Sequence, residues 1–147
     1  MKTIAEEIQG WIEDASIKVG VQVSIVPSAE ARELITLIME RYVFGRPTWW
    51  WDQLKLPCVQ FDRKTVRLSE ILPSLEGNVY LIPEYPNHDG PVFLVSAHGV
   101  EAILNHCPIF EYSILDRRAD WLITESHHDV LYVCRWVDAS HYVNENS

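Results

Sequence analysis

Apolar residues recur with a helical period at the start of the chain. One helical face would carry Ile4, Ile8, Trp11, Ile12 and Ala15. This spacing, with the capping-box pair Thr3 and Glu6 before it, predicts a helix over residues 4–15. From residue 17 to residue 25 the apolar positions change to a period of two. That alternation predicts a half-buried strand.

A second helical pattern follows, and we expect Ser28 to cap this helix and Gly45 to end it. The rest of the chain shows mainly short strand patterns. We expect strands at residues 58–61, 79–82, 92–95, 110–114, 121–124 and 130–136, and short helices at 69–75 and 98–106. Short turns join most of these strands, which is typical of an antiparallel sheet. The sequence therefore predicts an α+β fold with a mainly antiparallel sheet and with the two N-terminal helices packed on one face.

The chain has 147 residues, of which 48% are hydrophobic. This length and composition predict a single domain over residues 1–147, with a polar tail from about residue 138 that we expect to fray. No apolar run approaches the roughly 20 residues that cross a bilayer, and the acidic N-terminus is unlike a secretory signal. We therefore expect neither a membrane protein nor a secreted one.

Three cysteines, Cys58, Cys107 and Cys134, are spread along the chain. Their number is odd and no two of them are close in sequence, so we expect no disulfide framework. Reduced thiols are the ordinary state in the cytoplasm, which is the compartment that this pattern favours. Cys134 lies in an apolar run, and we expect it to be a small buried hydrophobic residue.

The net charge of −9 is unevenly distributed along the chain. Residues 1–67 contain nine basic and nine acidic residues, whereas residues 68–147 contain three basic and 12 acidic ones. An acidic excess of this kind repels nucleic acid and anionic membranes, and it attracts a basic protein or a cation. Ordinary solubility is the alternative explanation, because many soluble proteins are acidic.

Acidic residues fall in three predicted loops of the second half. The pairs are Glu84 and Asp89, Asp116 and Asp120, and Glu125 and Asp129. If the three loops open at one end of the sheet, their carboxylates form one negative patch suited to the capture of a basic protein. The sequence does not specify the strand order on which this arrangement depends.

Three consecutive tryptophans, Trp49, Trp50 and Trp51, are the most unusual feature of the chain. They cannot all enter one core, because neighbouring side chains point in different directions in a helix and in a strand. Tryptophan is frequent at binding hot spots, so one of the three could anchor a partner. The alternative is a loop packed over the edge of the core, with each indole N–H hydrogen bonded.

A metal site or metal-dependent enzyme is the alternative functional hypothesis. All six histidines follow residue 87, and two loops supply the ligand types His88, His127, His128 and Asp129. Adjacent histidines on an extended chain point to opposite faces, and no HxH, HExxH or paired-cysteine pattern is present. No nucleophile-elbow, phosphate-loop or dinucleotide motif is present either. We therefore assign no catalytic residue and no cofactor.

The segments NVYLIPE (78–84), FEY (110–112) and DWLITESHHD (120–129) resemble small bacterial proteins of the toxin-immunity type. The resemblance implies a small, acidic, cytoplasmic, single-domain protein that neutralises a toxin by blocking it. With the acidic loops and the tryptophans, it favours a protein-binding module rather than an enzyme. We expect this module to inhibit a basic toxin through its acidic surface.

Overall fold

The structure is a computed structural model that describes residues 2–45, 47, 50–55, 57–85, 88–126 and 128–136. The C-terminal tail that we expect to fray lies outside these residues. In chain order the elements are α1 (Ile4–Val19), β1 (Val23–Ile25), α2 (Ser28–Arg41), the 3-10 helix η1 (Trp50–Gln53), β2 (Cys58–Asp62), α3 (Leu68–Ile71), β3 (Asn78–Pro83), β4 (Phe93–Ser96), α4 (Val100–Asn105), β5 (Tyr112–Asp116), β6 (Trp121–Glu125) and β7 (Val130–Arg135).

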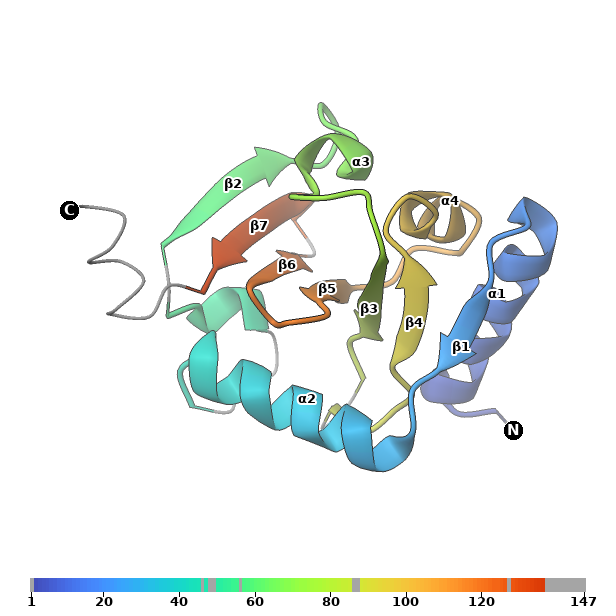
Figure 1. The fold of residues 1–147 in the computed structure, drawn as a ribbon, viewed down its shortest axis with the longest axis horizontal. Helices are drawn as coiled ribbons and strands as arrows, with labels where there is room; N and C mark the ends of the chain where they lie inside the picture. The colour runs from blue at the N-terminus through green and yellow to red at the C-terminus, as the bar shows by residue number, and fades with distance from the viewer. Residues whose placement is uncertain are drawn as a thin grey trace.

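The seven strands of the described residues form one sheet in the order β1-β4-β3-β5-β6-β7-β2 (Figure 1). Every neighbouring pair of strands is antiparallel. The predicted α+β class with a mainly antiparallel sheet is therefore confirmed. Neighbours in sequence pair as hairpins in the middle of the sheet, whereas the two earliest strands, β1 and β2, form its two edges.

Helices cover both faces of the sheet. Side chains alternate between the two faces along each strand, and both faces carry apolar side chains that the helices bury. On one face, Ile8 and Ile12 of α1 join a core that includes Leu81 of β3 and residues of α3 and α4. On the other face, Ile38 of α2 joins a second core that includes Leu122 of β6 and η1. Our expectation that both N-terminal helices pack on one face is therefore wrong. The chain changes face at the edge strand β1, which lies between the two helices in sequence.

The alternating pattern of residues 17–25 is only partly a strand. α1 continues to Val19, and the strand itself comprises only Val23–Ile25. Gly20 ends the helix in the left-handed conformation, with φ 69°, which glycine adopts without a steric penalty. The apolar positions before Gly20 lie on the last turn of a helix, where Ile17 is 81% exposed.

Four other elements differ from their predicted bounds. One of them, α4, comprises only Val100–Asn105 of the predicted helix at 98–106. α2 begins at Ser28 with Pro27 in the cap position and no side-chain capping bond, and it ends at Arg41 rather than at Gly45. α3 is a single turn, and β5 is shifted by two residues and buried on both faces. The other strands predicted after residue 57 lie within one residue of the observed bounds.

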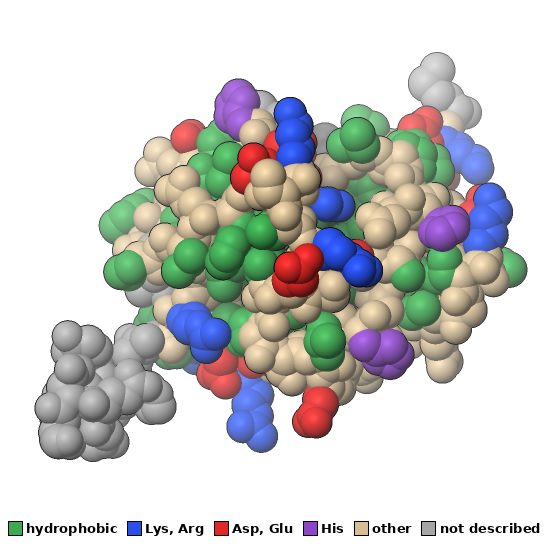
Figure 2. Space-filling model, turned by 90° about the horizontal axis from the view of Figure 1, so that it is seen from above, with side chains coloured by type: hydrophobic (Ala, Val, Ile, Leu, Met, Phe, Trp, Pro, Cys, Tyr) green, Lys and Arg blue, Asp and Glu red, His purple; other side chains and the backbone are tan. Residues whose placement is uncertain are grey.

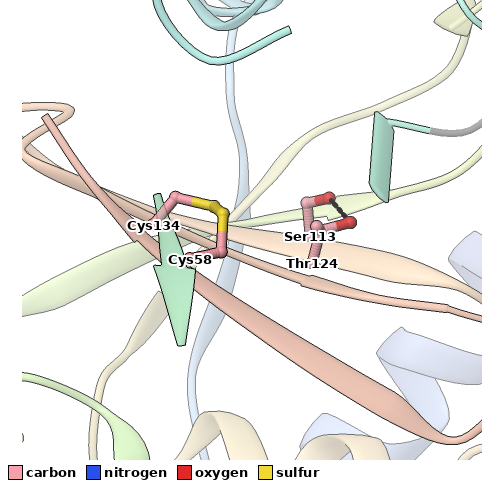
Figure 3. The surroundings of a disulfide bond; sticks show 4 residues. All are labelled: Cys58, Ser113, Thr124 and Cys134. Carbon is pink, nitrogen blue, oxygen red and sulfur yellow. Dashed lines mark hydrogen bonds between the residues drawn. A yellow bond between two sulfur atoms is a disulfide. The ribbon is translucent and has the colours of Figure 1, made fainter. Parts of the chain in front are cut away.

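Cys58 and Cys134 form a disulfide between β2 and β7 (Figure 3). The expectation of no disulfide is therefore wrong. The antiparallel register places the two residues directly opposite each other, although 76 positions separate them in sequence. Cys134 is buried as expected, and Cys107 is a free thiol. No helix in the described part of the chain is long and apolar enough to span a bilayer.

Candidate functional site

One end of the sheet collects carboxyl groups from several strands. β2, β3 and β6 finish there, and β5 and β7 begin there, because Asp62 pairs with Val130, Pro83 with Tyr112 and Glu125 with Leu131. We call this end of the sheet, with the adjoining β3–β4 loop, the carboxyl end. The name refers to its side-chain carboxyl groups and not to the direction of the strands. Its acidic residues are Asp62, Glu84, Asp89, Glu111, Glu125 and Asp129.

The third acidic loop lies at the opposite end of the sheet. Asp116 ends β5 and Asp120 precedes β6, so their turn is separated from the carboxyl end by the length of the strands. The Asp116 carboxylate accepts the backbone N–H groups of Arg118 and Asp120, both at 3.3 Å, and so shapes its own turn. The structure therefore brings two of the three predicted acidic loops to one end of the sheet. The third loop, with Asp116 and Asp120, lies at the other end.

Glu84 and Glu111 form a carboxyl pair on the face that α2 and η1 cover. The backbone N–H of Glu84 donates to the Glu111 carbonyl at 2.9 Å, and the two side-chain carboxyls are hydrogen bonded to each other. Burial, this hydrogen bond and the like charge of Glu111 raise the pKa of Glu84 well above its usual range. The pair therefore holds a proton to a higher pH than separate carboxyls would, and it carries less negative charge than two exposed glutamates. The search for acidic loops missed Glu111, because the sequence analysis placed it inside the predicted strand 110–114, whereas in the structure it precedes β5.

Glu125 and Tyr112 lie on the opposite face of the same end. The Arg63 Nε is 3.9 Å from Glu125 Oε2. The Tyr112 hydroxyl lies beside Glu125 and Arg63 and makes no well-formed hydrogen bond within the described residues. Burial raises the pKa of Glu125, an effect that Tyr112 and Arg63 oppose. This carboxyl is therefore also less acidic than an exposed one.

A buried serine organises the loop between β6 and β7. The Ser126 hydroxyl accepts the backbone N–H groups of His128 at 3.1 Å and Val130 at 3.3 Å. The Ser126 N–H in turn donates to the Val130 carbonyl at 2.8 Å. Asp129 follows at φ 61° with an exposed side chain, 3.7 Å from the Lys64 ammonium. Asp129 is thus exposed to solvent next to backbone groups that Ser126 holds by hydrogen bonds.

The β3–β4 loop is held by close packing of Tyr85 against Gly90. The Tyr85 hydroxyl donates to the Pro91 carbonyl at 2.8 Å, and the Tyr85 ring occupies the place that a Cβ on residue 90 would take. Asp89 is exposed on this loop. It stands at the rim of a groove of about 780 Å³, which α2 lines with apolar residues that include Ala31 and Ile35.

The tryptophans occupy different environments. Trp50 is 4% exposed and stacks on His88, with ring centroids 4.9 Å apart. Its backbone N–H donates to the Glu84 carboxyl. Trp51 is half-buried and meets His128 edge-on at 5.9 Å. Trp50 is thus part of the core, Trp51 offers a partial surface, and Trp49 lies outside the described residues.

The described members of the predicted metal site, His88, His128 and Asp129, do not form a metal-binding group. Within the described ranges, no group of three or more His, Cys, Asp or Glu side chains is arranged to hold a metal ion. His88 is turned toward the Pro47 carbonyl, with its Nε2 at 3.3 Å, and its ring lies on Trp50. His127 lies outside the described residues.

The exposed carboxylates of the carboxyl end are those of Asp62, Asp89 and Asp129, whereas its glutamates are half-buried. On the face shown in Figure 2, acidic and basic side chains lie interspersed. That face therefore presents no single field of one sign. At the carboxyl end, the negative charge that a partner could contact comes from the three exposed aspartates.

No protein-family model, curated protein or solved structure shows a significant match to this chain. The resemblance to toxin-immunity proteins stays a prediction.

Proposed function

We propose that this chain is a protein-binding module of the immunity type, which blocks a basic partner through the carboxyl end of its sheet. Asp89 and Asp129 are exposed in two loops in which Tyr85 and Ser126 hydrogen bond to neighbouring backbone groups, those of Pro91, His128 and Val130. Preorganised carboxylates of this kind steer a basic partner and bind it without a cost for ordering the loops.

The apolar groove beside Asp89 supports the same proposal. Its lining from α2 and from the 88–91 segment offers a place for an apolar side chain of the partner, next to an exposed negative charge. An apolar centre with charged groups at its rim is the usual composition of a protein interface. Trp51, which is half-buried near His128, adds aromatic surface at the far side of the carboxyl end.

We extend the proposal to a cytoplasmic location, and the Cys58–Cys134 disulfide, which is the observation that argues against this compartment, provides its test. Disulfides persist mainly in oxidising compartments and are rare among cytoplasmic proteins. Alkylation of free thiols at the moment of lysis, followed by mass spectrometry, measures the oxidation state of Cys58 and Cys134. Reduced thiols support the cytoplasm, and a fully oxidised pair contradicts it.

Two matched double variants test the proposed binding surface. Asp89→Asn with Asp129→Asn removes two charges from the carboxyl end, and Asp116→Asn with Asp120→Asn removes two charges from the opposite end. Each chain is used to capture proteins from the cells that produce it. The captured protein is then purified, its binding to each variant is measured at low and high salt, and its own activity is titrated with the wild-type chain.

The carboxyl-end variant should bind the partner more weakly and with a smaller salt dependence, whereas the control should match the wild type. The partner should also lose its activity when it is saturated with the chain. Equal binding by the two variants would overturn the proposed surface. Binding without inhibition would overturn the immunity function and leave the surface intact.

A further inference from the structure

The end of the sheet opposite the carboxyl end carries an excess of basic residues. α2 ends there at Arg41, the β5–β6 turn contains Arg117 and Arg118, and β7 ends at Arg135 (Figure 1). Lys55 joins them, because its backbone N–H donates to the Tyr42 carbonyl at 2.8 Å. We call these five residues the arginine end. The acidic residues among them are Glu40, Asp116 and Asp120.

Two hydrogen bonds connect these segments. The Tyr42 hydroxyl donates to the Ala119 carbonyl, which connects the end of α2 to the β5–β6 turn. The Trp136 N–H donates to the Asp120 carbonyl at 2.8 Å, which connects the end of β7 to the same turn. The five basic residues thus belong to one continuous part of the surface, although they come from four segments of the chain.

Aromatic rings position three of the five basic side chains. The Arg41 guanidinium lies 4.9 Å from the Trp136 ring, and that of Arg117 lies 5.1 Å from the Tyr80 ring. The Lys55 ammonium lies 5.8 Å from the Phe44 ring. A guanidinium that rests on an aromatic face keeps its N–H edge free for a bidentate contact with an anion.

The basic groups of this end are not neutralised by neighbouring carboxylates. None of the five forms an ion pair within 4.0 Å in the part of the chain that the structure describes. The Asp116 carboxylate is engaged by backbone N–H groups of its own turn. The nearest carboxyl to Tyr80 is that of Glu30, which accepts the Tyr80 hydroxyl at 3.5 Å on the side of α2.

We propose that the arginine end binds a short acidic segment of a protein. The guanidinium groups of Arg41 and Arg117, which lie over aromatic rings, and the exposed side chain of Arg118 present cationic N–H donors that can pair with the carboxylates of such a segment. The patch comprises one turn, the ends of two elements and Lys55, so it accommodates a segment of a few residues. A nucleic acid would extend beyond it over a chain whose net charge is −9, which repels further phosphates.

The test measures binding of a fluorescent poly-glutamate peptide to the full chain by anisotropy at low salt. A poly-glutamine peptide of equal length and an oligothymidylate of equal charge are the comparison probes. The test variant carries Arg117→Gln with Arg118→Gln. The control carries Lys18→Gln with Arg32→Gln, two exposed basic residues on α1 and α2 away from this end, so both variants have the same net charge.

We expect poly-glutamate to bind more tightly than either comparison probe. The test variant should weaken that binding about three- to tenfold, as expected for the loss of two exposed charge contacts. The control should bind as the wild type does. The single variant Arg118→Gln, whose side chain is exposed, provides the same comparison if the double variant is destabilised.

Three outcomes would overturn the proposal. They are equal binding by the test and control variants, no measurable binding of poly-glutamate, and tighter binding of the oligothymidylate at equal charge. The last outcome would assign the surface to a nucleic acid. None of them bears on the carboxyl end, so the two proposals stand or fall separately.

Discussion

At the carboxyl end the glutamates are half-buried and two of them contact each other, whereas at the arginine end the basic side chains are mainly exposed and three of the five lie on aromatic rings. Glu84 and Glu111 share a hydrogen bond at the first end, and Arg41 and Trp136 stack at the second. The number of acidic residues therefore overstates the negative surface charge of the carboxyl end. The net negative charge of the whole chain conceals the basic region at the arginine end.

The half-buried glutamates and the exposed basic residues should therefore affect different properties, the first the stability of the fold and the second the binding of a partner. Half-buried ionisable groups that touch each other have shifted pKa values and make stability depend on pH. Exposed groups on aromatic rings change stability little, but they are available to a partner. We therefore expect substitutions at the carboxyl glutamates to alter unfolding, and substitutions at the arginine end to alter binding alone.

Removal of the disulfide is the largest expected change, because it links β2 to the rest of the sheet and β2 carries Asp62 to the carboxyl end. Cys58→Ala with Cys134→Ala should lower the free energy of unfolding by about 2–4 kcal/mol. Urea unfolding measures the change, and Cys107→Ala is the control with a free thiol. A loss equal to that of the control would show that β2 is held without the disulfide.

The packing of the β3–β4 loop gives the next largest effect. Gly90→Ala should cost about 1–3 kcal/mol, because the new methyl group meets the Tyr85 ring. Gly10→Ala is the matched control, since a Cβ there meets open space within α1, and it should stabilise the chain by about 0.5–1 kcal/mol. Thermal unfolding of both variants measures how strongly the close packing of Tyr85 against Gly90 stabilises the chain.

The carboxyl pair should make stability fall as the pH rises. The folded-state pKa of Glu84 is raised, so its contribution is present below the ordinary glutamate pKa and is lost as the pH rises through the raised value. Glu84→Gln should flatten this dependence and stabilise the chain above neutral pH by about 1 kcal/mol, after allowance for solvent screening. Urea unfolding over a pH series measures the slope.

Glu101 provides a control of opposite sign. Burial acts to raise its pKa, but hydrogen bonds from the Ser69 N–H at 3.2 Å and Arg67 at 2.9 Å outweigh this and hold the pKa below its usual range. Its contribution is present above the ordinary glutamate pKa and is lost as the pH falls through the lowered one. If Glu84→Gln and Glu101→Gln change the pH slope in the same direction, the account of the carboxyl pair is wrong.

The smallest effects on stability are expected from the exposed charges. Arg118→Gln and Asp129→Asn should each leave the free energy of unfolding within about 0.5 kcal/mol of the wild type. Both side chains are exposed, and the only ion pair that Asp129 makes with a described residue, Lys64, spans 3.7 Å at the surface. A larger change in either variant would blur the distinction between the two ends.

Local pattern accounts for most of the elements that build these two ends. The capping box of Thr3 and Glu6 is present as predicted, and the hairpin from β6 to β7 follows from two apolar runs around a polar loop. The local pattern gives a wrong prediction at residues 17–19, where the apolar positions fit an alternating strand but the chain is helical. At residue 19 the chain is still helical, because the backbone turns only at Gly20.

The sequence by itself determined the class of fold, the positions of most strands and the acidic excess, because these depend on the period and type of neighbouring residues. Only the tertiary structure decided which residues meet across the sheet. Strand order placed Cys58 opposite Cys134, separated Asp116 from Asp129, and brought Glu84 to Glu111 and Arg41 to Trp136. Pairings over long sequence separations depend on register and on which face each helix covers, and a one-dimensional pattern specifies neither.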